Sequence, residues 1–523
     1  MISNAGFMAV AAILAISVIS RSLWHLVWRP YTVARWFQRQ GIRGPPYRIV
    51  VGSLLEMRRM NDAGRAAKGS PANAQCHDYT SLVAPFFHKW ASDYGKTFLY
   101  WLGPVPALCS TDMELLKQVL DDRTDLFQKD YLNPVLEIIT RKGLLTASGD
   151  DWKRHYKVIG HIFKQDNLKS VSAVAREGTQ KMIEQLCAKI ESSSGGHQAE
   201  IDDMTRYSEE LATGTIEQVI FGKSYKETRE VFVAGKEVQK LAAYALSDPS
   251  IPGYRYLPTR RNLRAWKLDK LIRRNVRQLI KARIAGGGVY GDDLLGLMLE
   301  ARRSEAKVLS TEEIIGECLT FFAAGEETSA SLLTWAMFLL SSYPQWQEKL
   351  REEVQRECLQ DDDPPIINVL GKMKLLNMFI LETLRLYSPL PLFTRKATSD
   401  TKLANIQVPK GTVITFPVVM LHRSKDTWGL DADEFNPMRF ENGASRAAKH
   451  SHALLAFSYG PRGCIGRHYA MVQVQTVMAM ILRRFSFTLS PHYVHKPKQF
   501  ITLVPRYGLP LIVRNLQQDG QNK

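Results

Sequence analysis

Cysteine is scarce in this chain. The 523 residues contain six cysteines, and no two of them form a C-x-x-C pair. This spacing argues against a structural zinc site and excludes a small scaffold stapled by disulfides. Few and scattered cysteines favour a reducing compartment. They are Cys76, Cys109, Cys187, Cys318, Cys358 and Cys464.

Other absences narrow the class of protein further. Residues 47–515 contain no low-complexity linker and no internal repeat. Hydrophobic residues make up 45% of the chain and charged residues 23%, which excludes disorder for most of it. Acidic residues are in the minority, because 52 Asp and Glu face 69 Lys and Arg and leave a net charge of +17. Zinc-finger, basic-zipper and RNA-platform patterns are missing, so we expect no nucleic-acid partner.

The excess positive charge is concentrated near the N-terminus. Between Arg21 and Lys68, ten Lys or Arg residues face two Asp or Glu, a net charge of +8. Residues 1–20 contain no charged side chain, and about 20 apolar residues span a bilayer. Because the basic residues follow the apolar run, we expect a retained single-pass anchor in membrane lipid, with the body in the cytosol, rather than a cleaved signal peptide.

One large domain is expected behind this anchor. Helical periodicity dominates, so the expected fold is mainly α with a small β region. The few strand-like runs are 98–102, 413–417 and 509–513. The predicted organisation is an anchor over 1–28, a basic, proline-containing linker over 29–48, a single domain over 49–515 and a tail over 516–523.

The longest predicted helix has clear signals at both ends. Ser310-Thr-Glu-Glu313 is a capping box, and Tyr343-Pro344 stops the helix. The segment is apolar on nearly all sides and should be buried. It nevertheless contains Gly325 beside Glu326 and Glu327, residues that are costly in a buried helix.

Two more helices follow this one. The segment 345–358 is rich in charge and is expected to be solvated. The segment 370–387 carries Glu382 and Arg385, which are three residues apart and therefore share a face.

The most specific feature of the sequence is a cysteine held among glycines. It reads Phe457-Ser-Tyr-Gly460-Pro-Arg462-Gly463-Cys464-Ile-Gly466, and a helical pattern over 468–482 follows. A cysteine before a helix N-terminus has a lowered pKa, which favours the thiolate. Glycines let the backbone approach a flat cofactor closely. Thiolate ligation of haem iron promotes O–O cleavage.

This string fits F-x-x-G-x-R-x-C-x-G at every fixed position, and it therefore resembles the cytochrome P-450 superfamily of haem-thiolate monooxygenases. The resemblance covers residues 44–515, because three further motifs occur in the family's order. They are Ala324-Gly325-x-Glu327-Thr328, Glu382-x-x-Arg385, and Phe435-Asn-Pro437-Met438-Arg439-Phe440, with Met438 where an acid is common. The stretches 41–47, 251–258 and 422–432 look like the plant clan that includes hormone-modifying and fatty-acid-hydroxylating members.

The resemblance implies a cofactor and the residues around it. Haem b (iron protoporphyrin IX) would take Cys464 as its axial metal ligand, in the loop that Phe457, Gly460 and Gly466 shape. Splitting the O–O bond needs protons, and a carboxylate–hydroxyl pair can supply them. The family places Thr328 and Glu327 in these roles, and Glu326 comes one residue early. The alternative for Thr328 is a bond to its own i−4 carbonyl.

The remaining charged motif residues have expected partners. Glu382, Arg385 and Arg439 would form a structural salt-bridge triad, because buried charges need partners. The two haem propionates need cations, and Arg462 and Arg395 are candidates. The family's W-x-x-x-R helix is imperfect, since Tyr156 stands where arginine is expected. Trp152 and His155 are the contacts expected from this helix.

Substrate contacts follow from the resemblance alone. They are Phe321, Ala324, Leu392, Phe393 and Val504, although core packing would also explain apolar residues there. The chain has no flavin or dinucleotide fingerprint, so electrons should come from a separate NADPH–cytochrome P-450 reductase. The reductase would meet a basic surface of this chain.

The activity expected is oxygen insertion into an apolar small molecule at the endoplasmic reticulum membrane. The substrate could be a terpenoid or steroid hormone, a cytokinin or a fatty acid. The alternatives are a haem-thiolate lyase or isomerase acting on peroxides, and a non-catalytic haem sensor. The intact acid–threonine pair and cysteine loop favour the monooxygenase.

Overall fold

The computed structural model of the protein describes residues 4–66, 70–71, 77–129, 143–163, 168–193, 197–222, 229–245, 257–286, 290–304, 308–358 and 366–519. Cys76, the part of the plant-clan stretch over 251–256 and the end of the expected tail, 520–523, lie outside the described residues.

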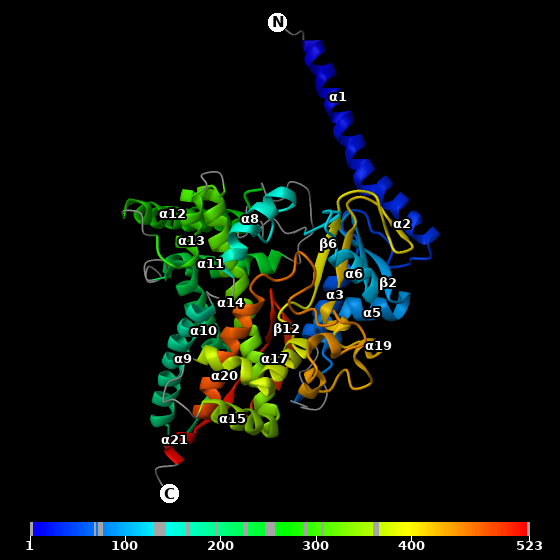
Figure 1. Cartoon of the computed structure of the whole chain (residues 1–523). Helices are drawn as coiled ribbons and strands as arrows, with labels where there is room; N and C mark the ends of the chain where they lie inside the picture. The colour runs from blue at the N-terminus through cyan, green and yellow to red at the C-terminus, as the bar shows by residue number, and fades with distance from the viewer. Residues whose placement is uncertain are drawn as a thin grey trace.

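Helices make up most of the structure, as the sequence predicts (Figure 1). Their bounds are α1 Asn4–Leu23, α2 Arg29–Arg39, α3 Leu54–Ala66, α4 Thr80–Val83, α5 Pro85–Tyr94, α6 Met113–Leu120, α8 Gly149–Ile162, α9 Leu168–Glu191, α10 Met204–Phe221, α11 Arg229–Ala245, α12 Arg260–Ala285, α13 Leu294–Ser304, α14 Thr311–Ser342, α15 Pro344–Cys358, α16 Ile366–Val369, α17 Lys374–Leu386, α18 Val418–Leu421, α19 Lys425–Trp428, α20 Arg467–Arg484 and α21 Leu516–Asp519. Short 3₁₀ turns cover Leu370–Lys372, Pro437–Phe440 and Ala444–Arg446.

The strands form small sheets beside the helices. They are β1 Ser70–Pro71, β2 Thr97–Leu102, β3 Val105–Ser110, β4 Phe127–Gln128, β5 Gln198–Ile201, β6 Phe393–Ala397, β7 Thr401–Leu403, β8 Ile406–Val408, β9 Val413–Phe416, β10 Phe485–Leu489, β11 Val494–His495, β12 Pro497–Gln499, β13 Leu503–Pro505 and β14 Leu511–Asn515. The largest sheet has the order β2-β3-β9-β6-β4, with β3 and β9 parallel and the other neighbours antiparallel. A second sheet has the order β10-β14-β5.

Helix α14 forms the centre of the helical part (Figure 1). The predicted capping box is present, since Ser310 N–H donates to Glu313 Oε2 at 2.7 Å and Glu313 N–H donates to Ser310 Oγ at 3.3 Å. The helix has 32 residues and is buried along most of its length, with α10 packed against it. At 1.5 Å per residue it is about 48 Å long and crosses the whole domain.

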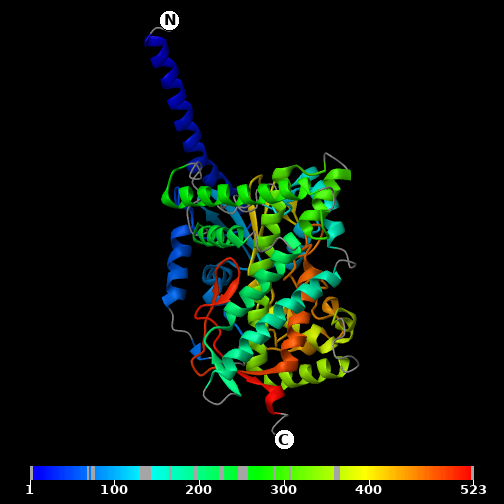
Figure 2. The same cartoon turned by 90° about the vertical axis from the view of Figure 1, so that its left-hand side faces the viewer.

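The N-terminal helix stands away from the body (Figures 1 and 2). The segment Val10–Arg39 is long and apolar enough to cross a membrane. The chain stays helical beyond residue 28, through a π-helical segment, Trp24–Trp28, into α2. Helix α2 buries Phe37 in the body, and Trp36 Nε1 donates to the Gln407 carbonyl at 3.1 Å. Residues 29–39 of the predicted linker are therefore helical and packed against the body.

Helix α15 also differs from its prediction. It buries Trp346 and Leu350, so it is amphipathic and not solvated all round. Its buried Glu353 carboxylate accepts the backbone N–H groups of Leu375 and Leu376 at 2.8 and 2.9 Å. Backbone N–H groups at the start of a helix have no partner within that helix. The Glu353 side chain of α15 therefore acts as an N-terminal cap for α17.

Candidate functional site

The cysteine loop is closed by its own backbone. Cys464 N–H donates to the Phe457 carbonyl at 2.8 Å, and Gly463 N–H donates to the Gly460 carbonyl at 3.0 Å. Gly460 has a φ of 74°, and a Cβ there would lie 2.0 Å from the Leu120 carbonyl oxygen. Only glycine fits where the loop passes the end of α6. Gly466 then stands at the start of α20, in front of Arg467.

The Cys464 thiol combines exposure with desolvation. Its side chain is exposed, yet the surrounding protein desolvates it. This burial raises the pKa of the thiol, although a hydrogen bond from the Gly466 backbone and the charges of Lys129 and Arg467 act to lower it. The sequence predicts a lowered pKa at a helix start, but desolvation outweighs that effect here. A thiol that coordinates a metal is nonetheless deprotonated outright.

Arg462 is fixed beside this thiol by two contacts. Its guanidinium lies over the Trp152 ring of α8, with Cζ 4.6 Å from the ring centroid. Its Nη2 donates to the Ala147 carbonyl at 2.6 Å. Two of the expected cofactor contacts, Trp152 and Arg462, are therefore in contact with each other.

Lys129 joins this cluster and was missed by the sequence analysis. Burial and then the charges of Arg395 and Arg462 lower the pKa of Lys129 to about 7, whereas Cys464 acts to raise it. Arg395 is itself buried on β6. Two basic side chains and one thiol thus act on Lys129. This donor set fits haem, which needs one axial ligand and cations for two carboxylates.

Helix α14 is partly exposed to solvent in its middle. Ala324 is exposed, and Glu327 and Thr328 are half-buried, although most of the helix is buried. Thr328 Oγ1 donates to the Ala324 carbonyl at 2.6 Å. This is the local bond that a helical threonine ordinarily makes, and it leaves the hydroxyl oxygen as an acceptor.

The two adjacent carboxylates have different environments. Glu326 is buried and pairs with Lys236 Nζ of α11 at 3.0 Å, while Thr213 Oγ1 donates to it at 3.3 Å. Glu327 Oε2 has no hydrogen-bond partner among the described residues, and burial, Glu326 and Glu209 raise the pKa of Glu327 to about 8. Glu327 is therefore protonated at neutral pH, whereas Glu326 is the ion-paired residue.

The structure places His155 differently from the sequence prediction. Its Nδ1 lies 2.5 Å from Glu317 Oε1, and its Nε2 lies 3.4 Å from Glu313 Oε1. Both carboxylates belong to α14. Both ring nitrogens are therefore engaged by carboxylates of one helix. Tyr156, at the position of the missing arginine, is exposed and packs on Trp152.

The expected substrate residues divide into two groups. Ala324 is exposed, and Leu392, Phe393 and Val504 are half-buried. Phe321 is buried and stacks on Phe163 with 4.9 Å between ring centroids. Phe321 therefore packs in the core, which is the alternative explanation for an apolar residue at that position.

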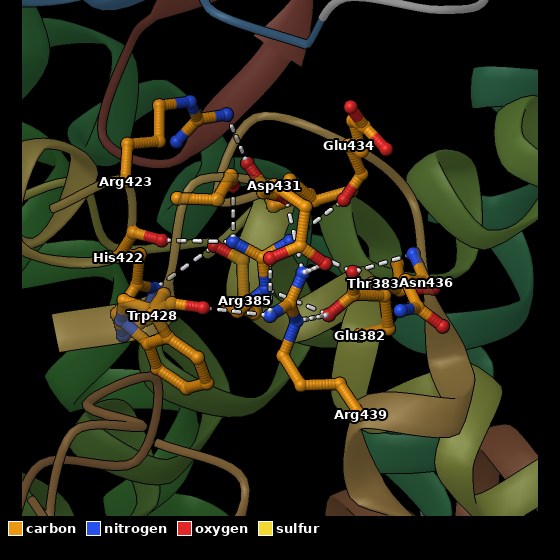
Figure 3. Close-up of polar contacts among 12 residues, drawn as sticks. Glu382, Thr383, Arg385, His422, Arg423, Trp428, Asp431, Glu434, Asn436 and Arg439 are labelled. Carbon is orange, nitrogen blue, oxygen red and sulfur yellow. Dashed lines mark hydrogen bonds and ion pairs between the residues drawn. The ribbon is translucent and has the colours of Figure 1, made fainter. Parts of the chain in front are cut away.

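The triad residues lie together in a fully buried network (Figure 3). Arg385 donates through Nε and Nη2 to the two oxygens of Glu382, each at 2.7 Å. Its remaining hydrogen bonds go to backbone carbonyls of His422, Ala432 and Glu434. Every arm of this buried guanidinium is thus occupied.

Arg439 is tied mainly to a residue that the sequence analysis missed. Its Nη2 lies 2.7 Å from Asp431 Oδ2, whereas its Nε is 3.9 Å from Glu382 Oε2 (Figure 3). Met438, in the position where an acid is common, is exposed. The acidic partner therefore comes from Asp431, eight residues before Arg439. The only signal for it was its place in the plant-clan stretch.

His422 connects this network to the cysteine loop. Its Nδ1 donates to the Arg385 carbonyl at 2.9 Å, and its Nε2 accepts the Leu455 N–H at 2.8 Å. Burial and then the charges of Arg385 and Arg423 lower the pKa of His422 to about 3, so the ring stays neutral. Leu455 lies two residues before Phe457, where the cysteine loop begins.

Comparison with known proteins agrees with this geometry. The cytochrome P450 family model matches residues 75–509. The chain therefore belongs to the cytochrome P450 family and is a haem-thiolate monooxygenase that incorporates oxygen from O₂.

Particular relatives are plant proteins. The chain is 40% identical to Cytochrome P450 709B1 of Arabidopsis thaliana over 496 residues, 94% of this chain and 95% of that protein. It is 36% identical to Cytochrome P450 734A1 of the same species over 509 residues, 95% of each. The solved structure titled "Retinoic acid bound cyanobacterial CYP120A1" has a TM-score of 0.75 at 20% identity and covers 91% of this chain and 99% of that one, which shows the shared fold.

The buried network makes a prediction about stability. Arg385→Lys keeps the charge but cannot reproduce the bidentate fork and the three carbonyl contacts. We expect the free energy of unfolding to fall by about 3 kcal/mol, the lower end of the cost of breaking a buried ion pair. Denaturant unfolding followed by fluorescence measures this.

Arg264→Lys is the matched control for this substitution. Arg264 also grips a carboxylate with two nitrogens, at 2.6 and 2.7 Å from Glu237, but the pair is exposed. The Arg264→Lys substitution should leave the unfolding curve unchanged, because exposed ion pairs contribute little to the free energy of unfolding. Equal effects of the two substitutions would contradict the importance of the buried network.

Proposed function

We propose that this chain inserts one oxygen atom of O₂ into an apolar small molecule, with electrons from a separate NADPH–cytochrome P-450 reductase. The substrate classes that fit are terpenoid or steroid hormones, cytokinins and fatty acids. The observation that carries the proposal is the half-buried pair of Glu327 and Thr328 in the partly exposed middle of α14. Glu327 is protonated at neutral pH.

The residues that would hold haem are those around the Cys464 thiol. Cys464 would be the axial ligand, and Phe457, Gly460 and Gly466 would keep its loop in shape. Arg462, Arg395 and Lys129 would neutralise the two carboxylates. When bound, haem with a thiolate ligand supplies the chemistry that cleaves the O–O bond of dioxygen, which needs protons.

Glu327 and Thr328 would supply those protons. Glu327 holds a proton at neutral pH because burial and two nearby carboxylates raise its pKa to about 8. Thr328 can accept a proton through its hydroxyl oxygen and pass its own on, as a side chain that is both donor and acceptor. Lys236 compensates the charge of the neighbouring Glu326, so that the two adjacent carboxyl groups need not both be neutral.

We propose the endoplasmic reticulum membrane as the location. The predicted anchor, residues 1–28, contains the apolar helix α1 and would cross the membrane once, and the basic residues that follow it would keep the catalytic domain in the cytosol. Trp24 and Trp28 follow the apolar run and are exposed, which suits aromatic residues at a membrane interface and supports the anchor.

A panel of candidate substrates tests the proposed activity. Members of the four classes are first screened for substrate-induced changes in the haem spectrum, and those that bind are incubated with reductase, NADPH and ¹⁸O₂. We expect a product that carries one ¹⁸O atom and that needs NADPH. Conversion of a peroxide without NADPH or O₂ would instead identify a lyase or isomerase. Binding of panel members without turnover of any would favour a haem sensor.

The acid–threonine pair predicts two different defects. Thr328→Ala should retain haem, but product formation should fall by about 10²-fold or more, while NADPH consumption falls less and peroxide makes up the difference. Glu327→Gln should slow NADPH oxidation itself, because an amide cannot relay a proton. The measurements are product, peroxide and NADPH for each variant. Unchanged coupling of NADPH to product in Thr328→Ala would refute the proton-relay role.

The pH dependence separates Glu327 from its neighbour. The protonated form of Glu327 is populated below pH 8, so NADPH oxidation should decline as the pH rises from 7 to 9. Glu327→Gln should have a flat profile over this range. Glu326→Gln is the adjacent control and should keep the decline but move it to lower pH, because the Glu326 charge helps to raise the pKa of Glu327.

A further inference from the structure

A buried ion pair joins α8 to α14 outside the chemistry proposed so far. His155 is 1% exposed and Glu317 is 0% exposed. They are 162 residues apart in the sequence, and their side chains meet at 2.5 Å. Glu317 Oε2 has no hydrogen-bond partner among the described residues, so His155 provides the one hydrogen bond found there for this carboxylate.

The contacts determine the protonation of His155. A carboxylate only accepts hydrogen bonds, and Glu317 and Glu313 face the two ring nitrogens. Both nitrogens must therefore donate, which only the charged imidazolium can do. Burial opposes the charge, but the hydrogen bonds and charges of the two glutamates outweigh it and raise the pKa of His155.

The neighbouring residues fix the ends of this contact. Arg154 donates to Glu313 Oε1 at 2.6 Å and to the Val308 carbonyl at 2.6 Å, just before α14. Glu313 also caps the helix through the Ser310 N–H. The first two turns of α14 are therefore clamped to α8 by charged groups. Glu317 itself lies on the same face of α14 as Ala324 and Thr328, because 7 and 11 residues are close to whole numbers of turns.

Helix α8 also contacts Arg462, a cation of the cysteine loop. Trp152 precedes His155 by three residues, so both lie on one side of α8. The Trp152 ring supports the Arg462 guanidinium at 4.6 Å. In this chain α8 offers no arginine at position 156, where Tyr156 points to solvent. Arg462 is thus a cation whose position depends on where α8 sits.

We infer that His155 and Glu317 are a positioning pair, which fixes α8 against α14 and through Trp152 holds Arg462 where it binds a haem carboxylate. The inference rests on the haem site proposed above. It predicts that breaking the pair loosens haem although neither residue contacts it.

The test measures haem loss from the full chain. Haem transfer to excess apomyoglobin is followed by absorbance for the wild type, H155Q, E317Q and the double variant. Each single substitution should speed haem loss by about tenfold or more, because it leaves a buried charge without its partner. The double variant should be no faster than the faster single variant, because both remove the same interaction. E317Q preserves the side-chain shape and gives the answer if H155Q does not fold.

Two further variants separate positioning from general stability. W152A should also speed haem loss, and adding H155Q to it should change the rate by less than about twofold, because both act through Arg462. D293N is the control, since it breaks a partly buried pair, Arg283 Nη1 to Asp293 Oδ1 at 2.5 Å, that involves neither α8 nor the cysteine loop. It should lower the midpoint of thermal unfolding and leave haem loss within about twofold of the wild type.

The outcomes are distinct. Unchanged haem loss in H155Q and E317Q would overturn the inference, as would equally fast loss in D293N or multiplied rates in the H155Q/W152A variant. If the wild type itself lacked the thiolate-type spectrum of the reduced carbon monoxide complex, the proposed haem site would fail instead of the positioning pair.

Discussion

The buried ion pair between Glu382 and Arg385 is the interaction on which the rest of the site depends. Removing two charges from water is costly, and the cost is offset only when every donor and acceptor finds a partner. Arg385 meets this condition by binding Glu382 and three backbone carbonyls of the segment 422–434. His422 then links the same arginine to Leu455, just before the cysteine loop. The network therefore holds α17 and the cysteine loop in one fixed relation.

The two sides of the proposed haem site are built in different ways. The cysteine side is fixed by backbone hydrogen bonds, a required glycine at Gly460 and a group of buried or half-buried cations. The α14 side is a long buried helix that is exposed at Ala324. The Glu327 carboxyl and the Thr328 hydroxyl are partly accessible there. The cysteine loop and the acid–hydroxyl pair thus lie on different elements. The pair of His155 and Glu317 bridges the two sides through α8.

Local sequence signals predicted what depends on local physics. The capping box at Ser310, the strands around 98–102 and 413–416 and the Glu382–Arg385 spacing all lie within single elements, and the structure contains each of them. Local signals do not reveal distant partners. The contact of His155 with Glu317 joins residues 162 apart, and the proximity of Lys129 to Arg395 and Arg462 depends on the fold. Helix α2 docks because Phe37 finds a pocket of residues from β2 and β3, which no pattern within 29–48 reveals.

The central claim is that Cys464 supplies the thiolate to a haem held between the cysteine loop and α14. The most direct measurement is the absorbance spectrum of the reduced carbon monoxide complex of the full chain and of Cys464→Ser. The account predicts the thiolate-type spectrum for the wild type and its loss in the variant. A Cys464→Ser protein that kept both this spectrum and monooxygenase activity would contradict the account.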